Sequence, residues 1–288
     1  MNSGANRIDQ RFEALRSAGK KGLIPYITAG HPSPAASVAL MHECVAAGAD
    51  LLELGVPFSD VMADGPVIQR ACQTALEAGT DIDAVLSMVA EFRRDDPHTP
   101  VILMGYMNPL ERRGAEVFSH ECAAAGVDGV LIVDCPFDEA QQTQATFAQS
   151  GLHQIFLVAP TSTAARIERM VPMAGGFIYY VSLKGVTGAA TLDAQTLQPA
   201  IRPIRHVSDL PIAVGFGIST PEQAAAAAAA ADAVVIGSAL VQRLDAAQSV
   251  DEARVIARDY LAPVRAAMDT AGSTDSALAE ANVQQVGA

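Results

Sequence analysis

The sequence lacks the residue patterns that mark a metal centre or a disulfide framework. Its four cysteines, Cys44, Cys72, Cys122 and Cys135, form no C-x-x-C pair, and none of its six histidines stands in H-x-x-x-H or H-E-x-x-H spacing. Zinc sites and disulfide-stapled secreted domains depend on such spacings. We therefore expect no metal site, and we expect the thiols to be free and buried.

Positive charge and long apolar runs are also scarce. The chain has 19 Lys and Arg against 32 Asp and Glu, for a net charge of −13, which disfavours nucleic acid and anionic membrane surfaces as partners. No apolar run approaches the roughly 20 residues that span a bilayer. The first residues, MNSGANRIDQ, contain no apolar signal-peptide core. The sequence predicts a cytoplasmic protein whose anionic ligands, if any, are held by local groups.

What the sequence has instead is an alternation of short apolar runs with longer helix-forming stretches. Eight apolar runs follow one another, at 22–30, 50–58, 101–108, 129–135, 153–160, 177–184, 211–218 and 233–240. Runs that are apolar on both faces, such as 130–133, are typical of a parallel sheet covered by helices. Eight strand–helix units in series predict an α/β fold, a (β/α)8 barrel of the TIM-barrel class.

Two further segments extend this fold prediction. Residues 6–18 are expected to form an extra N-terminal amphipathic helix, with Ile8, Phe12 and Leu15 on the face that closes the bottom of the barrel. The alanine run at 224–231 predicts a closely packed outer helix, because alanine is the best helix former.

The same units define the domain organisation. We expect a single barrel domain over residues 1–270. Beyond it, residues 271–288 are dominated by Ala, Ser, Gln and Gly, and we expect a frayed or disordered tail.

One phrase recurs before two of the predicted strands. It reads HECVAAGAD at 42–50 and HECAAAGVD at 120–128. The glycine is expected to end a helix in the left-handed conformation, and the aspartate to open the next strand. We interpret the phrase as a structural repeat without chemistry.

The loop after the second run carries unusual carboxylates. It reads LELGVPFSDVMADGP from Leu52 to Pro66. Glu53 stands inside an apolar strand, where burial would raise its pKa toward the range useful for proton transfer. The alternative is a structural glutamate satisfied by a backbone amide or a cation. Asp64 is either catalytic or the cap of the helix that begins near Pro66, and Asp60 is expected to stabilise the loop.

Glycine-rich segments follow the last three runs. They are SLKGVTG at 182–188, GFGIS at 215–219 and GS at 237–238. Each could serve an ordinary turn. Together they indicate a phosphate site, because glycines allow close backbone approach and a helix after residue 238 would direct its N–H groups at the anion. These features alone predict a barrel that acts on a phosphorylated metabolite through a carboxylate acid/base.

The combination of these segments resembles the tryptophan synthase alpha subunit family, whose signature centres on L-E-L-G-x-P-F-S-D-P-x-A-D-G-P. That signature stands here at 52–66, and the match continues in Ile68-Gln69, GVTG at 185–188, GFGIS at 215–219 and IGSA at 236–239. The resemblance covers roughly residues 8 to 268, with the motifs in the expected order, and is therefore specific.

The resemblance implies a lyase of tryptophan biosynthesis, grouped with the carbon–oxygen lyases. Its reaction is the retro-aldol cleavage of indole-3-glycerol phosphate into indole and glyceraldehyde 3-phosphate. Carried over by position, the general acid/base is Glu53 and the second catalytic carboxylate is Asp64. Asp64 would accept a hydrogen bond from the indole N–H and stabilise the positive charge that develops on the ring.

The resemblance also implies residues that bind the rest of the substrate. Backbone amides would hold the phosphate at Gly188, Gly217, Gly237 and Ser238. Thr187 would position a closing loop. Four side chains either line the indole and glycerol-phosphate pocket or belong to ordinary barrel core: Tyr26, Met104, Tyr179 and Phe216.

The family further implies a beta partner subunit in an alpha2beta2 heterotetramer. Pyridoxal phosphate is expected only in that partner, because the alpha reaction needs no added electron sink. Two departures bear on the shared interface. Val61 replaces the usual proline of the signature, so a fixed φ is lost, and Leu183 stands where many relatives carry arginine.

Three alternatives stay open on the sequence. The first is a stand-alone indole-3-glycerol-phosphate lyase with no partner, and the second is another phosphosugar barrel, such as a ribulose-phosphate epimerase or an indole-glycerol-phosphate synthase. The third is a non-catalytic barrel that serves only as an allosteric subunit. Retention of both Glu53 and Asp64 argues against the third.

Overall fold

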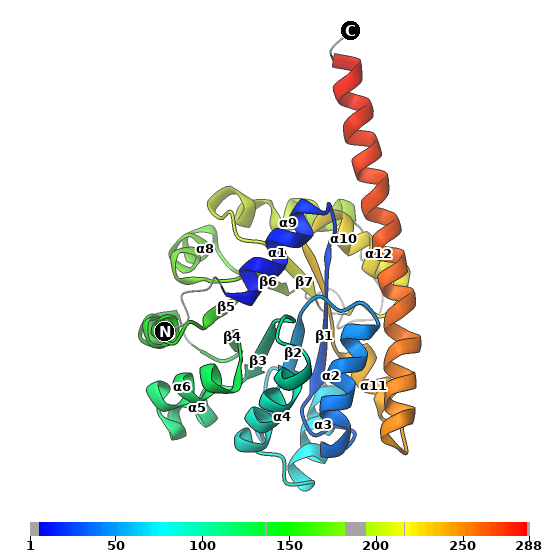
Figure 1. The fold of residues 1–288 in the computed structure, drawn as a ribbon. Helices are drawn as coiled ribbons and strands as arrows, with labels where there is room; N and C mark the ends of the chain where they lie inside the picture. The colour runs from blue at the N-terminus through cyan, green and yellow to red at the C-terminus, as the bar shows by residue number, and fades with distance from the viewer. Residues whose placement is uncertain (1–5, 136, 182–193, 216, 287–288) are drawn as a thin grey trace.

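The structure is a computed structural model that describes residues 6–135, 137–181, 194–215 and 217–286. Eight parallel strands close into a barrel in sequence order, with β8 pairing with β1. Figure 1 shows the strands at the centre of the molecule with helices around them. The strands are β1 Gly22–Thr28, β2 Leu52–Gly55, β3 Val101–Gly105, β4 Gly129–Ile132, β5 His153–Val158, β6 Ile178–Val181, β7 Ile212–Gly215 and β8 Ala233–Ile236. Each strand lies inside one of the predicted apolar runs, so the (β/α)8 prediction is confirmed.

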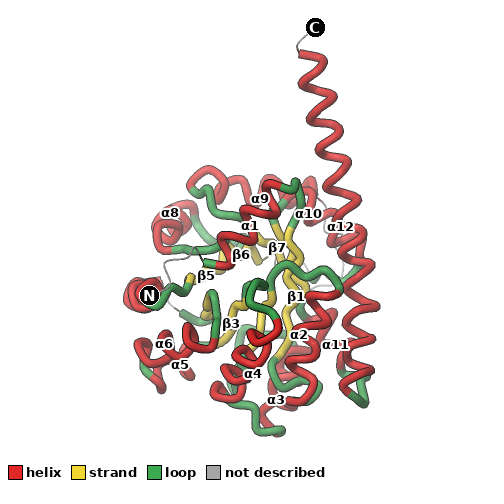
Figure 2. The backbone as a smooth tube through the Cα atoms, in the orientation of Figure 1, coloured by secondary structure: helices red, strands yellow, loops and turns green. Residues whose placement is uncertain are grey.

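Helices surround the barrel, as Figure 2 shows by its red ring around the yellow strands. They are α1 Arg7–Ser17, η1 Pro34–Ala36, α2 Ser37–Ala46, α3 Pro66–Glu77, α4 Ile82–Asp95, α5 Met107–Arg113, α6 Ala115–Ala125, α7 Phe137–Gln149, α8 Ala164–Met170, η2 Val171–Met173, α9 Ala194–Val207, α10 Pro221–Ala230, α11 Ser238–Leu244 and α12 Val250–Val286. The alanine run forms α10, as predicted, and its small side chains let α10 pack closely on α12.

The N-terminal helix closes one end of the barrel. Asn6 caps α1 by accepting a hydrogen bond from the Ile8 N–H at 2.9 Å. Ile8, Phe12 and Leu15 are buried in one cluster with the strand side chains that face the barrel interior, such as Ile24. The predicted plug is therefore confirmed, and it leaves the carboxyl ends of the strands for the functional site.

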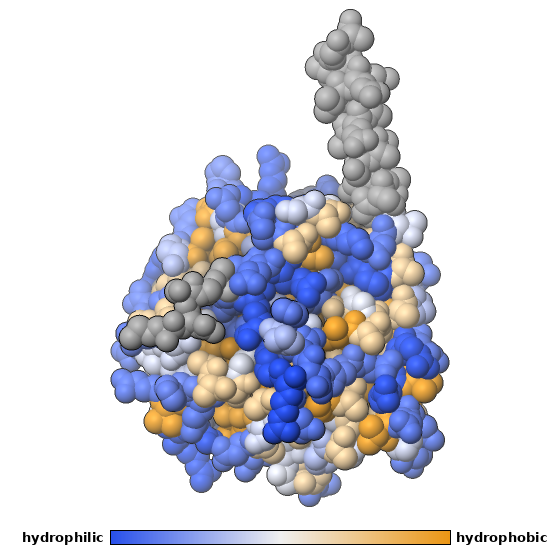
Figure 3. Space-filling view, in the orientation of Figure 1, coloured by the Kyte–Doolittle hydropathy of each residue, from blue (hydrophilic) through white to orange (hydrophobic). Residues whose placement is uncertain are grey.

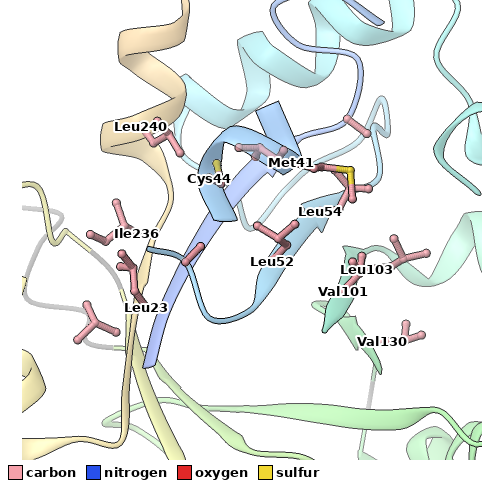
Figure 4. Packing of buried hydrophobic residues seen from close by; sticks show 14 of the residues in the cluster. Leu23, Met41, Cys44, Leu52, Leu54, Val101, Leu103, Val130, Ile236 and Leu240 are labelled. Atoms are coloured by element: carbon pink, nitrogen blue, oxygen red, sulfur yellow. The ribbon is translucent and has the colours of Figure 1, made fainter. Parts of the chain in front are cut away.

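Strand side chains alternate between two apolar layers. Leu51, Ile102 and Leu131 face the barrel interior. Their neighbours along the chain face the outer helices. Figure 4 shows part of this outer layer, in which Leu52 lies near Met41 and Cys44 of α2, and Ile236 lies on the side of Leu240 of α11. Both layers consist of buried apolar side chains.

The recurring Ala-Ala-Gly phrase has a second purpose that the sequence did not indicate. Its glycines adopt the predicted left-handed conformation, with φ of 101° at Gly48 and 92° at Gly126. The aspartate two residues later accepts a hydrogen bond from the first residues of the preceding strand. Asp50 binds the Leu23 N–H at 2.9 Å, and Asp128 binds the Val101 N–H at 2.8 Å.

Each of these aspartates also pairs with an arginine from an outer helix. Arg265 of α12 lies 3.2 Å from Asp50, and Arg93 of α4 lies 2.7 Å from Asp128. Asp232, which directly precedes β8, makes the same two contacts: it accepts a hydrogen bond from the Ile212 N–H at 2.7 Å and lies 2.7 Å from Arg205 of α9. The phrase therefore ties neighbouring strands and helices together at the end of the barrel opposite the predicted site.

The surface of the barrel is mostly polar on the face seen in Figure 3, where hydrophilic residues predominate and hydrophobic residues form small separate groups. In the part of the chain that the structure describes, no helix has the length and apolar character needed to cross a membrane.

Helix α12 continues past residue 270, and Figure 1 shows its last part projecting away from the barrel. The domain boundary at 270 and the frayed tail at 271–288 stay predictions.

A pair of glycine substitutions tests the packing of the repeated phrase. Gly48 and Gly79 both follow a helix with positive φ, but a Cβ on Gly48 would lie 2.6 Å from Arg265, whereas one on Gly79 meets nothing within 4 Å. Gly79→Ala should cost about 1 kcal/mol of unfolding free energy, and Gly48→Ala about 2–3 kcal/mol. Urea denaturation of both variants measures the difference. Equal losses would show that Arg265 yields without cost.

Candidate active site

Glu53 lies in the interior of the barrel, in β2. Its side chain is 3% exposed, and in the strand register it stands between Tyr26 of β1 and Ile102 of β3. Its Oε1 has no hydrogen-bond partner among the described residues, and no Lys or Arg among them pairs with it. The alternative of a structural glutamate satisfied by a cation or an amide therefore finds no support in the described part of the chain.

This environment keeps the Glu53 carboxyl protonated at neutral pH. Burial raises its pKa to about 8, and the negative charge of Asp64 contributes in the same direction. A carboxylate removed from water without a partner is costly, so the group binds its proton more tightly instead. The sequence predicted this rise in pKa, and a pKa of about 8 means that the protonated form of Glu53 predominates at neutral pH.

Two tyrosines share the interior with Glu53, and each occupies space that a glycine leaves free. A Cβ on Gly55 would lie 2.1 Å from the Tyr26 hydroxyl, and one on Gly215 would lie 2.3 Å from the Tyr179 hydroxyl. The glycines at the ends of β2 and β7 therefore make room for aromatic side chains on the neighbouring strands.

The electrostatics of these tyrosines show how close they are to the carboxylates. Burial raises the pKa of Tyr179 well above its usual value, and the charges of Glu53 and Asp64 raise it further. Burial likewise raises the pKa of Tyr26, which also feels both carboxylates and whose hydroxyl lies 3.2 Å from the Thr28 Oγ1. Tyr26 and Tyr179 are therefore core residues that also border the acidic pair.

Asp64 lies in the loop between β2 and α3. The helix begins at Pro66, with Gly65 as the N-cap residue and no side-chain hydrogen bond at the cap. The capping alternative for Asp64 is therefore wrong. Its Oδ2 accepts a hydrogen bond of 2.8 Å from the Tyr106 hydroxyl. Burial raises the pKa of Asp64, and the Tyr106 hydrogen bond partly opposes that rise.

Tyr106 was not singled out from the sequence. It follows β3 directly and precedes α5, so the barrel brings it to the same end as the loop that carries Asp64. Its position just beyond a strand end was the signal that could have identified it. Asp60, by contrast, is exposed and forms no hydrogen bond with the described residues, so its expected loop-stabilising role is not supported.

The second side of the site lies at the end of β8. The Gly237 carbonyl accepts hydrogen bonds from the N–H groups of Leu240 and Val241, and α11 begins at Ser238. A Cβ built on Gly237 would lie 3.5 Å from the Cβ of Tyr26. The predicted phosphate residues at the end of β8 and the predicted catalytic residue in β2 are therefore brought together around Tyr26.

The remaining predicted residues divide into described and undescribed positions. Gly217 follows β7 with φ of 75°. Met104 of β3 is half-buried, aligns with Gly55 in the strand register, and packs in both apolar clusters of the interior. Four predicted positions lie outside the described residues: Leu183, Thr187, Gly188 and Phe216.

The arrangement suits proton transfer to and from a bound molecule. A neutral carboxylic acid, an oriented second carboxyl group and two tyrosines converge at the carboxyl end of one barrel. The four cysteines are free, and in the described ranges no three His, Cys, Asp or Glu residues are placed to hold a metal ion. General acid/base catalysis is the chemistry that these side chains can supply themselves.

Comparisons with known proteins agree on one family. The family model described as tryptophan synthase alpha chain matches residues 12–269. Among curated proteins, the tryptophan synthase alpha chain of Nitrosococcus oceani is 54% identical over 271 residues, which is 94% of this chain and 99% of that protein. That of Thioalkalivibrio sulfidiphilus is 53% identical, over 92% of this chain and 100% of that protein.

Solved structures give the same result. The tryptophan synthase subunit alpha of Legionella pneumophila superposes with a TM-score of 0.86 at 43% identity, covering 93% of this chain and 100% of that one. A Mycobacterium tuberculosis tryptophan synthase structure matches with a TM-score of 0.82 at 36% identity, over 92% of this chain and 99% of that one. The likeness therefore extends over the whole barrel.

The buried acid predicts a specific dependence of stability on pH. The pKa of Glu53 is raised from 4.5 to about 8 in the folded chain, so its neutral form favours folding below pH 4.5 and that contribution is lost as pH rises through 8. Glu53→Gln removes the titration. Its unfolding free energy relative to wild type should therefore increase between pH 5 and pH 9 by up to about 4 kcal/mol.

Urea unfolding at several pH values measures this difference. A difference between Glu53→Gln and wild type that stays constant from pH 5 to pH 9 would contradict a buried, neutral Glu53.

Proposed function

The chain belongs to the tryptophan synthase alpha chain family and is a lyase that catalyses the alpha reaction of tryptophan biosynthesis; on this premise we propose that Glu53 and Asp64 are its catalytic carboxylates. The resemblance drawn from the signature at 52–66 is thereby confirmed, and the alternative of a different phosphosugar barrel is wrong. The observation that carries the proposal is the buried Glu53 carboxyl, whose pKa is about 8.

Glu53 acts as the acid and then as the base. In its neutral form it donates a proton to C3 of the indole ring of indole-3-glycerol phosphate, which gives the indolenine tautomer. The bond between C3 and the glycerol chain then breaks as the adjacent hydroxyl loses its proton to the Glu53 carboxylate. The electrons of that bond restore the aromatic indole, the hydroxyl carbon becomes the aldehyde of glyceraldehyde 3-phosphate, and Glu53 regains its proton.

Asp64 stabilises the charge that this sequence creates. Protonation at C3 places positive charge on the indole ring and its nitrogen, and an ionised carboxylate that accepts the N–H hydrogen bond opposes that charge. The Asp64 carboxyl is held by Tyr106 at the same end of the barrel as Glu53. The negative charge of Asp64 raises the pKa of Glu53, which supports the view that the two carboxyl groups lie close enough to interact.

The glycine-rich strand ends bind the phosphate. We assign this role to the backbone amides of Gly188, Gly217, Gly237 and Ser238, of which the last three lie at described ends of β7 and β8. The support is the close approach of Gly237 to Tyr26, which links the phosphate end of the substrate to the indole end. Amides hold the anion without a basic cluster, which suits a chain of net charge −13.

The remaining predicted residues would form the walls of the substrate pocket. Tyr26, Met104 and Tyr179 face the interior beside Glu53 and would contact the indole or the glycerol chain. Phe216 would complete the pocket and Thr187 would position the closing loop, and for these two the support is the family signature alone.

Family membership implies a complex with a beta partner, and we propose the alpha2beta2 form of that complex in the cytoplasm. Pyridoxal phosphate belongs to the partner in this proposal, because the indole ring itself accepts the electrons of the broken bond. The barrel over 1–270 is the catalytic unit, and residues 271–288 lie beyond the stretch matched by the family model, which ends at residue 269.

An indole-release assay tests the two carboxylates. Glu53→Gln should lower kcat for indole-3-glycerol phosphate cleavage by about 100-fold or more, because the proton donor is lost. Asp64→Asn should lower it by roughly 100-fold through the loss of charge stabilisation. Glu43→Gln is the matched control, since Glu43 is also a buried glutamate but pairs with Arg254 on the outer side of the barrel.

The outcomes discriminate between the functions. Loss in both active-site variants with near wild-type activity in Glu43→Gln supports the assignment. Full activity in Glu53→Gln would overturn the acid/base role. A wild-type chain that binds substrate but releases no indole, even with its beta partner, would identify a non-catalytic subunit.

The same assay tests the partner. Addition of a purified beta subunit should raise the cleavage rate on the order of tenfold or more, as expected when two sites are coupled through an interface. A rate that does not change with the beta subunit would identify a stand-alone lyase.

A further inference from the structure

The Tyr106 hydroxyl makes two hydrogen bonds to one loop. It lies 2.8 Å from Asp64 Oδ2 and 3.2 Å from the backbone nitrogen of Ala63. A phenol has one hydrogen to donate and lone pairs to accept with. Its hydrogen therefore goes to the Asp64 carboxylate, while its oxygen accepts the Ala63 N–H. Tyr106 thereby fixes both the side chain of Asp64 and the main chain just before it.

The ring of Tyr106 holds the same loop by apolar contact. Its centroid lies 5.8 Å from that of Phe58, and Val61, 8% exposed, is buried in the same cluster. Val61 replaces the proline of the family signature. The loop therefore gains from packing on Tyr106 a restraint that a proline φ would otherwise supply.

A second residue holds the loop in a different way. The Gln69 side chain of α3 donates to the Asp64 carbonyl at 2.8 Å, so it restrains the main chain and leaves the carboxylate untouched. Among the described residues, Tyr106 alone forms a hydrogen bond to the Asp64 carboxylate. The orientation of that carboxylate depends on one hydroxyl.

We propose that Tyr106 is the positioning residue that holds Asp64, through its hydroxyl, in the orientation needed for cleavage. The inference rests on the proposed role of Asp64. Tyr106 directly follows β3, at the end of a barrel strand, whereas Asp64 lies in a loop that lacks the proline of the signature. The donor, Tyr106, is fixed by the barrel, and the acceptor, Asp64, lies in a less constrained loop. Their hydrogen bond therefore sets the orientation of the Asp64 carboxylate.

Tyr106→Phe tests the proposal with little change in volume. In the indole-release assay with the beta subunit, kcat should fall about tenfold to hundredfold while KM changes less, because one hydrogen bond to a charged group is lost. That hydrogen bond lowers the pKa of Asp64. Its loss should move the acidic limb of the kcat/KM profile to higher pH, which a merely structural role would not do.

A double-mutant cycle shows whether Tyr106 acts through Asp64. The double variant Tyr106→Phe/Asp64→Asn should be no slower than Asp64→Asn alone. Tyr180→Phe is the matched control, since Tyr180 of β6 is buried in the outer layer and should keep wild-type kcat and pH profile. A double variant slower than Asp64→Asn by the full Tyr106→Phe factor would overturn the proposal, as would a wild-type acidic limb in Tyr106→Phe.

Hydrogen exchange separates failure of this inference from failure of the proposed function. The Ala63 amide should exchange faster in Tyr106→Phe than in the wild-type chain, because its acceptor oxygen is gone. Unchanged exchange would overturn the positioning role. Full activity in Asp64→Asn would instead overturn the catalytic role of Asp64, and the catalytic part of this inference with it.

Discussion

The burial of one unpaired carboxyl group, that of Glu53, is the constraint on which the rest of the structure depends. An ionised carboxylate in that place would be costly, so burial raises the Glu53 pKa to about 8 and favours the protonated form at neutral pH. An open or flexible sheet would admit water and remove this effect. The closed barrel, with a layer of buried apolar side chains on each side of its strands, leaves Glu53 of β2 only 3% exposed.

One end of the barrel carries the contacts that stabilise the fold, and the other carries the candidate active-site residues. At one end, α1 packs its apolar side chains against the barrel interior, and the aspartates of the repeated phrase bind strand N–H groups and arginines of the outer helices. At the other end, glycines at the ends of β2 and β7 give space to Tyr26 and Tyr179 beside the carboxylates. Rigidity at the first end allows the second to carry polar groups that an ordinary core would exclude.

The roles of individual residues were less evenly predictable than the fold. Glu53 stood out because strand interiors seldom carry glutamate, and its burial followed from the alternation of side chains along β2. Asp64 was ambiguous, because an aspartate close to the start of a helix, here two residues before Pro66, is also a common cap. Its contact with Tyr106 spans 42 residues of sequence, and no local pattern records a contact of that kind. The strand ends brought the two together.

The sequence by itself determined the barrel, its plug and the place of the glycine-rich strand ends, because these depend on side-chain periodicity and on local conformational preference, which operate over a few residues. The family signature added the reaction. Only the tertiary structure decided that Asp64 is held by Tyr106 instead of capping α3, that Asp50 and Asp128 bind strands that precede them, and that the Glu53 Oε1 has no partner in the described part of the chain. Each of these depends on which groups from distant strands share one small volume, and hydrogen bonding and desolvation are set by that proximity.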